Sequence, residues 1–128
     1  MKILYYNWTQ FDNTANQGGG VNVYQKNLID YLLKNTDNEI YFLSSGTYYD
    51  LINNKPHIKK SKNIYGDKCK TYKLINSKCL APASAMYDDI NTYLTDVEDY
   101  EVLKKFIKEH GGFDVIHFNN IEGLSLNC

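Results

Sequence analysis

Short apolar runs and one longer amphipathic stretch alternate at the start of the chain, and their order predicts a strand, a helix and a second strand. Residues 3–6 form a continuous apolar run, which is typical of a strand covered on both faces in a parallel sheet. A helix is predicted from residue 21 to about residue 35, where apolar residues recur at helical spacing, at Val21, Tyr24, Leu28 and Leu32. The run "EIYFL" at 39–43 stops at two serines and a glycine, as a second strand would. Such a β-α-β unit favours parallel, right-handed pairing, with the loops after the strands at one edge of the sheet.

The pattern is weaker in the middle of the chain and becomes clear again towards its end. Residues 48–52 predict a short helix, residues 53–63 a loop and residues 68–76 an extended segment. The segment "VEDYEVLKKFIKE" at 97–109 predicts a helix capped by Thr95 or Asp96 and closed by two glycines, with an apolar face made of Tyr100, Leu103, Phe106 and Ile107. A buried strand is predicted within "FDVIHFNN" at 113–120, with its core at 115–118, and a helix start at 121–128. Because a helix that stops so soon leaves an apolar face uncovered, we expect the chain to be part of a longer protein.

Composition narrows the class of protein. The chain has 128 residues, of which 43% are hydrophobic and 23% charged, as expected for one soluble globular domain. All fourteen cations are lysine, and with a net charge of −1 a nucleic-acid binder is disfavoured. The charges are segregated, because eight lysines gather at 55–78 with a single acid, while six acids without a cation lie at 88–101. We interpret this as a solvated loop next to an acidic helix start, in preference to a binding surface.

Cysteine usage and hydropathy bear on the cellular compartment. The three cysteines, Cys69, Cys79 and Cys128, are an odd number without CxxC spacing, so neither a disulfide framework nor a zinc site is expected. The N-terminal apolar run is too short for a signal peptide, and no stretch is long enough to span a bilayer. We therefore expect reduced thiols, no metal site and a cytoplasmic protein, with contact at the inner face of a membrane left open.

Three adjacent glycines, Gly18, Gly19 and Gly20, precede the first predicted helix. Glycines let a ligand approach backbone N–H groups closely, and the start of the helix adds its positive dipole end, so the expected guest is anionic or polar. A flexible turn before the helix explains the glycines equally well. The segment is neither GxGxxG nor GxxxxGK[ST], and no acid ends the second predicted strand, which disfavours a dinucleotide-dependent oxidoreductase and a P-loop protein.

Four segments in this order, "MKILYYNW", "GGGVNVYQKNLIDYLLKN", "EIYFLSSG" and "FDVIHFNNIEGLS", resemble the N-terminal domain of GT-B glycosyltransferases, specifically the large retaining family 4. That family's pattern is an opening strand, a GG loop leading into a helix with an asparagine-leucine pair, and a strand of the form DVIHxHN. The lysine-rich middle has no counterpart in the pattern. The resemblance implies a Rossmann-like, three-layer α/β domain with a mostly parallel sheet over residues 1–128, the acceptor-side half of a two-domain protein.

The resemblance also implies an activity. Members of the family transfer a hexose from a UDP- or GDP-linked nucleotide sugar to a sugar, lipid or polyol acceptor, with retention of configuration and without a cofactor. The paired glutamates and the nucleotide pocket would belong to a C-terminal domain of the same protein, so this chain alone would be inactive. The alternative is a non-catalytic Rossmann-like module that binds a small anionic ligand or a partner protein.

Candidate site residues follow from the resemblance and from their positions. The glycine loop and Asn22 would face the phosphates or the sugar of the donor. His117, the candidate catalytic residue, would hydrogen-bond to a sugar hydroxyl, the alternative being a histidine packed within the strand. The family often has a second histidine where this chain has Asn119. The candidate acceptor-binding residues are Trp8, with a loop anchor as its alternative, Asn119, Asn120 and Glu122, with a first-turn helix acid as the alternative for Glu122.

Overall fold

The computed structural model describes residues 1–7, 20–45, 48–77 and 90–119 of the chain, with the side chains of the second helix described from residue 97 onward. The elements in chain order are β1 (Lys2–Asn7), α1 (Gly20–Asn35), β2 (Glu39–Ser44), β3 (His57–Lys60), β4 (Cys69–Ile75), α2 (Ile90–Glu109) and β5 (Val115–Phe118). The described part of the chain is therefore an α/β fold, as the sequence predicts.

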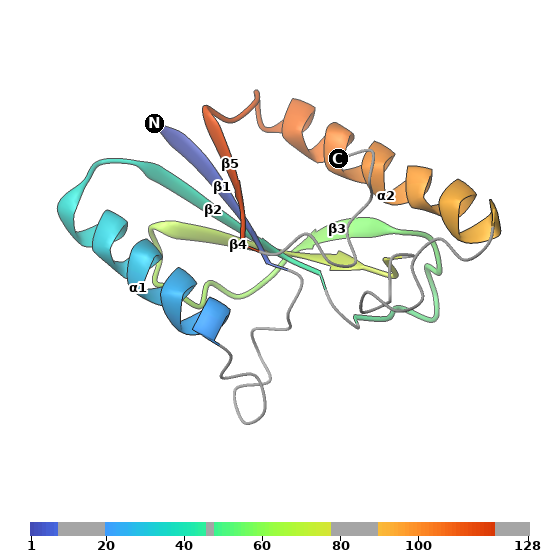
Figure 1. Cartoon of the computed structure of the whole chain (residues 1–128), viewed down its shortest axis with the longest axis horizontal. Helices are drawn as coiled ribbons and strands as arrows, with labels where there is room; N and C mark the ends of the chain where they lie inside the picture. The colour runs from blue at the N-terminus through green and yellow to red at the C-terminus, as the bar shows by residue number, and fades with distance from the viewer. Residues whose placement is uncertain (8–19, 46–47, 78–89, 120–128) are drawn as a thin grey trace.

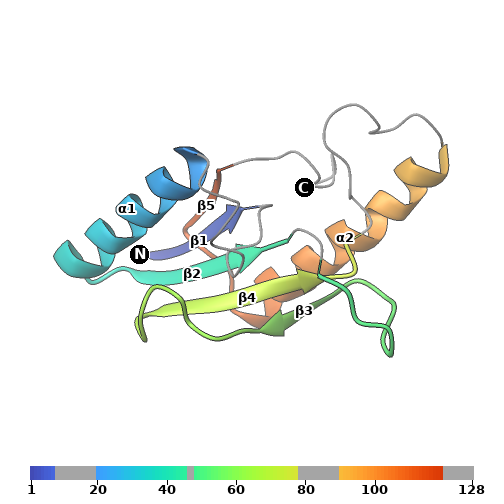
Figure 2. The same ribbon diagram turned by 90° about the horizontal axis from the view of Figure 1, so that it is seen from below.

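The five strands form one mixed, mostly parallel sheet in the order β3-β4-β2-β1-β5 (Figure 2). Strand β1 is parallel to both of its neighbours, with Leu4 opposite Tyr41 of β2 and Ile116 of β5. Strand β2 is also parallel to β4, whereas β3 pairs with β4 in the antiparallel direction. The chain thus moves outward from β1 to β2 and β4 and then returns through α2 to β5, on the other side of β1. The strand order reverses between β1 and β5.

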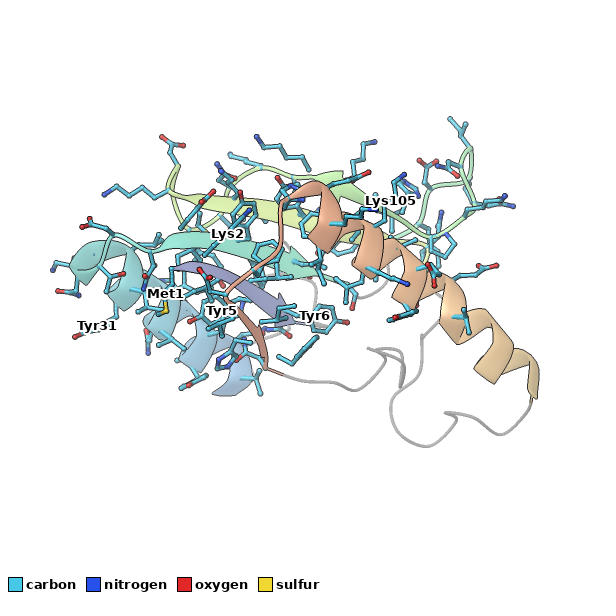
Figure 3. All side chains as sticks on the ribbon, turned by 90° about the horizontal axis from the view of Figure 1, so that it is seen from above. Met1, Lys2, Tyr5, Tyr6, Tyr31 and Lys105 are labelled. Atoms are coloured by element: carbon cyan, nitrogen blue, oxygen red, sulfur yellow. The ribbon has the colours of Figure 1, made fainter. Side chains whose placement is uncertain are left out.

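One helix covers each face of the sheet, so the fold has three layers (Figure 1). Alternate residues of a strand point to opposite faces, and the neighbours Tyr5 and Tyr6 of β1 accordingly enter different cores (Figure 3). Ile29 of α1 packs with Tyr5 on one face, which we call the α1 face. Phe106 of α2 packs with Tyr6 on the other, the α2 face.

Three predictions for the middle of the chain are wrong. Residues 48–52 are not helical, because the Asp50 carboxylate accepts hydrogen bonds from the backbone N–H groups of Ile52 and Asn53 and bends the chain there. The predicted loop at 53–63 contains β3, which forms because Ile58 packs against the α2-face core while β3 pairs with β4. Helix α2 begins at Ile90, so Thr95 and Asp96 lie inside the helix and do not cap it.

The amphipathic faces differ in part from the prediction. In α1 the fully buried residues are Gln25 and Ile29, whereas Val21 and Tyr24 are exposed. In α2 the predicted face is confirmed at Leu103 and Phe106, both buried. The helix ends as predicted, with Gly111 and Gly112 at positive φ angles of 73° and 86° and the N–H of Gly112 donating to the carbonyl of Ile107 at 2.9 Å.

The last strand is less enclosed than its apolar sequence predicts. Strand β5 lies at an edge of the described sheet and is only partly buried, with Val115 exposed. A strand at the edge of a sheet has neighbours on one side only, which explains why apolar content alone overestimated its burial.

Candidate functional site

Buried polar side chains gather at one edge of the sheet, where the parallel strands end. Asn7 ends β1, Ser44 ends β2 and is followed by Ser45, and Asn76 and Ser77 follow β4. Two buried helix residues reach the same edge, Gln25 from α1 and Asp99 from α2. We call these seven residues the polar edge. Thr71, in the middle of β4, is the other buried polar residue in the described part of the chain.

Two hydrogen-bonded pairs of amide side chains lie at this edge, where the strand order reverses. The Asn7 Nδ2 group donates to Asn22 Oδ1 of α1 at 2.8 Å. The Asn119 Nδ2 group, directly after β5, donates to Gln25 Oε1 of α1. We call Asn7, Asn22, Gln25 and Asn119 the amide cluster. It joins β1, β5 and the first two turns of α1, three segments that are far apart in the sequence.

Local periodicity explains how these side chains come together. Asn7 follows Ile3 and Tyr5 on the α1 face, because side chains alternate along a strand. Asn22 and Gln25 are three residues apart in α1 and so share one side of the helix. The backbone fixes the two strand ends, since the Asn119 N–H donates to the Tyr6 carbonyl at 3.1 Å and the Ser45 N–H to the Asn7 carbonyl at 3.1 Å.

His117 lies beside the amide cluster and packs against aromatic rings. Its ring centroid is 5.0 Å from that of Tyr5 and 6.4 Å from that of Tyr24. His117 is half-buried and lies on the α1 face, two residues before Asn119. His117 therefore packs against neighbouring rings, as its stated alternative predicts. It also lies close to the candidate site.

The amide cluster is uncharged, and the phenols next to it are held neutral. Burial raises the pKa of Tyr5, and the neighbouring Tyr24 raises it further. Burial also raises the pKa of Tyr65, although a hydrogen bond with Gln25 acts in the opposite direction. Amides and phenols both donate and accept hydrogen bonds. The site is thus suited to a neutral ligand rich in hydroxyl groups.

The polar edge continues towards β4 on the α2 face. The Tyr6 hydroxyl and Ser45 Oγ are 2.6 Å apart, and both residues are buried. Ser77 Oγ donates to Asp99 Oδ2 at 2.7 Å, and Asp99 is only 1% exposed. Asp99, one of the six acids at 88–101, is therefore buried. Its position four residues before Leu103 was the available signal, because that spacing places Asp99 on the buried face of α2.

Of the predicted site residues, the structure brings Asn22, His117 and Asn119 together. Gly20 is the first residue of α1, and a Cβ built on it meets no atom of the described residues within 4 Å. The other candidates, Trp8, Gly18, Gly19, Asn120 and Glu122, lie outside the described residues. Sequence reasoning missed Asn7 and Gln25, because the hydrophobic pattern gave no reason to expect these polar side chains to be buried.

A separate apolar hollow lies on the opposite face. It has a volume of about 180 Å³ and is lined by Tyr100, Leu103, Lys104, Ile107, Ile116 and Phe118. It lies between α2 and β5, away from the amide cluster, and offers few groups for polar chemistry. We therefore place the candidate site at the amide cluster.

The described residues contain no group of three or more histidine, cysteine or carboxylate side chains that could hold a metal ion. Neither described helix has the length and apolar character needed to cross a membrane. Comparison with protein-family models, curated proteins and solved structures found no match for the chain.

Proposed function

We propose that this chain is the Rossmann-like, acceptor-side half of a GT-B glycosyltransferase of retaining family 4. The observation that carries the proposal is the amide cluster and its position. Open α/β sheets bind their ligands outside the carboxyl ends of the strands, at the point where the strand order reverses. In this sheet that point lies between β1 and β5, where Asn7, Asn22, Gln25 and Asn119 meet.

The chemistry of the cluster supports a carbohydrate as the acceptor. Each amide offers donors and an acceptor at fixed positions, and sugar hydroxyls require both. His117 would donate a hydrogen bond to an acceptor hydroxyl from the β5 side. The start of α1 at Gly20, with its positive dipole end, would face the phosphates of the donor.

The proposal requires a second domain that supplies the remaining parts of the active site. The nucleotide-sugar pocket and the paired glutamates would come from a C-terminal domain of the same protein. Hexose transfer from a UDP- or GDP-linked donor would then take place in the cleft between the two halves, and this chain alone would bind acceptor without turning it over. A cytoplasmic location belongs to the same proposal.

An NMR titration of the chain tests acceptor binding directly. Free hexoses and disaccharides, UDP-glucose and GDP-mannose are added separately, and the side-chain NH₂ signals of the amide cluster are followed. Acceptor sugars should shift the signals of Asn7, Asn22 and Asn119. Asn27 and Asn53 are exposed elsewhere and serve as internal controls that should not move.

Two variants separate binding from folding. Asn119→Ala removes a donor from the cluster and should weaken sugar binding. Gly20→Ala adds a methyl group in open space, so the free energy of unfolding should change by less than about 0.5 kcal/mol. Weaker nucleotide-sugar binding by Gly20→Ala in the complete two-domain protein would then report close approach of the donor to the backbone.

Two results would contradict the proposal. Tight binding of nucleotide alone at α1 would make this the donor-side domain. Absence of any shift in the cluster with every sugar would favour the alternative, a non-catalytic binding module.

A further inference from the structure

The turn between β2 and β3 carries two adjacent apolar side chains fully into solvent. Leu51 is 95% exposed and Ile52 is 100% exposed, the highest values among the large hydrophobic residues that the structure describes. Tyr49 beside them is 61% exposed. Figure 2 shows this turn projecting beyond the ends of β3 and β4. Exposed apolar groups gathered in one place commonly mark an interaction surface.

Hydrogen bonds hold the turn in this shape. The Asp50 carboxylate accepts from the N–H groups of Ile52 at 2.9 Å and Asn53 at 3.2 Å. Asn76, after β4, fastens the turn from the other side: its Oδ1 accepts from the Asp50 N–H at 2.9 Å, and its Nδ2 donates to the carbonyls of Asp50 and Asn53. Asn76 has a positive φ of 54°, which most residues with a side chain avoid. The exposure of Leu51 and Ile52 is thus built into the fold.

Two paired lysines lie in the strands next to the turn. Lys59 of β3 lies directly opposite Lys73 of β4, and like charges at such a position destabilise a sheet. The Lys73 ammonium lies 4.4 Å from the centre of the Tyr48 ring, within the same turn. Residues 48–77 hold seven lysines and only two acids. One of those acids, Asp50, is engaged by backbone N–H groups. The charge distribution therefore fits an anionic partner.

We propose that the tip formed by Tyr49, Leu51 and Ile52, with Lys59 and Lys73 behind it, docks on an anionic phospholipid bilayer. The apolar side chains would enter the boundary between headgroups and acyl chains, and the lysines would contact lipid phosphates. A nucleic acid would use the lysines but would leave Leu51 and Ile52 in water. The turn follows β2, at the same edge of the sheet as the amide cluster, so docking turns that edge towards the bilayer. This inference does not depend on the proposed function.

Sedimentation with vesicles tests the proposal on the 128-residue chain. Vesicles of phosphatidylcholine with phosphatidylglycerol should bind the protein, vesicles of phosphatidylcholine alone should bind it far less, and high salt should release it. The double variant Leu51→Ser/Ile52→Ser should bind at least about tenfold more weakly, because two apolar side chains no longer leave water. Lys59→Gln and Lys73→Gln should each weaken binding by roughly fivefold.

Matched controls use residues of the same kind on other surfaces. Val23→Ser/Tyr31→Ser removes two exposed apolar side chains from α1, and Lys104→Gln/Lys105→Gln removes two exposed lysines from α2. Both should bind vesicles as the parent chain does. The tip and control variants replace exposed side chains and should keep the parent thermal midpoint. Lys59→Gln and Lys73→Gln each remove one of two like charges that face each other, so neither should lower it.

A fluorescent probe reports insertion independently of affinity. Ile52→Cys, in a chain with Cys79→Ser and Cys128→Ser, is labelled with an environment-sensitive dye. The remaining Cys69 is buried, and burial raises its pKa to about 12, so its thiol should not compete for the label. A blue shift with anionic vesicles is expected. An unshifted spectrum, equal binding of tip and control variants, or binding of a single-stranded RNA in place of vesicles would overturn the proposal.

Discussion

The two ends of the parallel strands have opposite characters. Towards the amino ends, aromatic rings pack together on the α2 face. The ring centroids of Phe106 and His110 are 4.3 Å apart, and those of Tyr41 and Phe113 are 5.1 Å apart. The Lys2 ammonium lies 5.2 Å from the rings of Tyr41 and Phe113. At the carboxyl ends, the fold buries amides, serines and an aspartate. One end is packed like a core, and the other holds hydrogen-bonding groups away from water.

This difference separates residues kept for stability from residues kept for a site. Aromatic packing contributes buried apolar area and favourable edge-to-face contacts. A buried amide contributes little net stability even when it is paired, and it costs free energy when it loses its partner. A fold that places most of its buried polar groups at one edge is organised there around something other than packing. Substitutions at the two ends of the strands test this assignment.

Phe106→Ala should destabilise the protein most. Phe106 is 4% exposed and contacts the rings of Tyr72, at 4.9 Å, and His110. Removing the ring leaves a cavity between α2 and the sheet, and large-to-small changes of this kind cost about 3–5 kcal/mol. Chemical denaturation followed by circular dichroism measures the loss. Sugar and vesicle binding, scaled to the folded fraction, should stay unchanged.

The matched control is Tyr31→Ala on the outer side of α1, which should change the free energy of unfolding by less than about 0.5 kcal/mol (Figure 3). A cost below about 1 kcal/mol for Phe106→Ala would mean that the amino ends are not the stabilising region.

Gln25→Leu should have an intermediate effect on stability and a large one on binding. The change leaves the Asn119 amide without its acceptor and removes the hydrogen bond to Tyr65. The expected cost is about 1–3 kcal/mol, and sugar-induced shifts at the remaining amides should disappear. The double variant Gln25→Leu/Asn119→Leu should recover part of the lost stability without recovering binding. Strictly additive costs would show that the two amides do not act as a pair.

Much of the fold could be predicted from sequence because its signals are local. Residues 3–6 and 40–43 are continuous apolar runs, and the paired glycines mark the end of α2, so these elements are confirmed with small changes of boundary. Strand β3 could not be predicted in this way. Its four residues, HIKK, contain a single large apolar side chain, and their extended form depends on pairing with β4, which begins nine residues after β3 ends.

Only part of the candidate site could be predicted from the sequence, for a related reason. Asn22, His117 and Asn119 belong to motifs, so resemblance singled them out. Gln25 and Asp99 are polar residues at buried helix positions, and a pattern that assigns polar side chains to solvent excludes them by construction. Their partners, Asn119 and Ser77, are 94 and 22 residues away, and only the tertiary fold brings them together.

Glu39→Gln should give the smallest change, at the amino end of β2. The Glu39 carboxylate accepts from the Lys70 ammonium at 2.7 Å and from the Tyr41 hydroxyl at 2.7 Å, and these bonds hold its pKa below the usual value. Both charged side chains are nearly half exposed, so water screens the pair and the loss at neutral pH should be at most about 1 kcal/mol.

The pH dependence of this small difference identifies its cause. A carboxyl group whose pKa is lowered by folding binds fewer protons in the folded state, so its contribution is present above the unfolded pKa and is lost as the pH falls through the folded value. The stability curves of the parent chain and Glu39→Gln should therefore converge in acid. If the difference in unfolding free energy persists after Glu39 is protonated, its cause would be packing at Tyr41 and not the ion pair. Exposed residues at the amino ends of the strands would then also contribute to stability through packing.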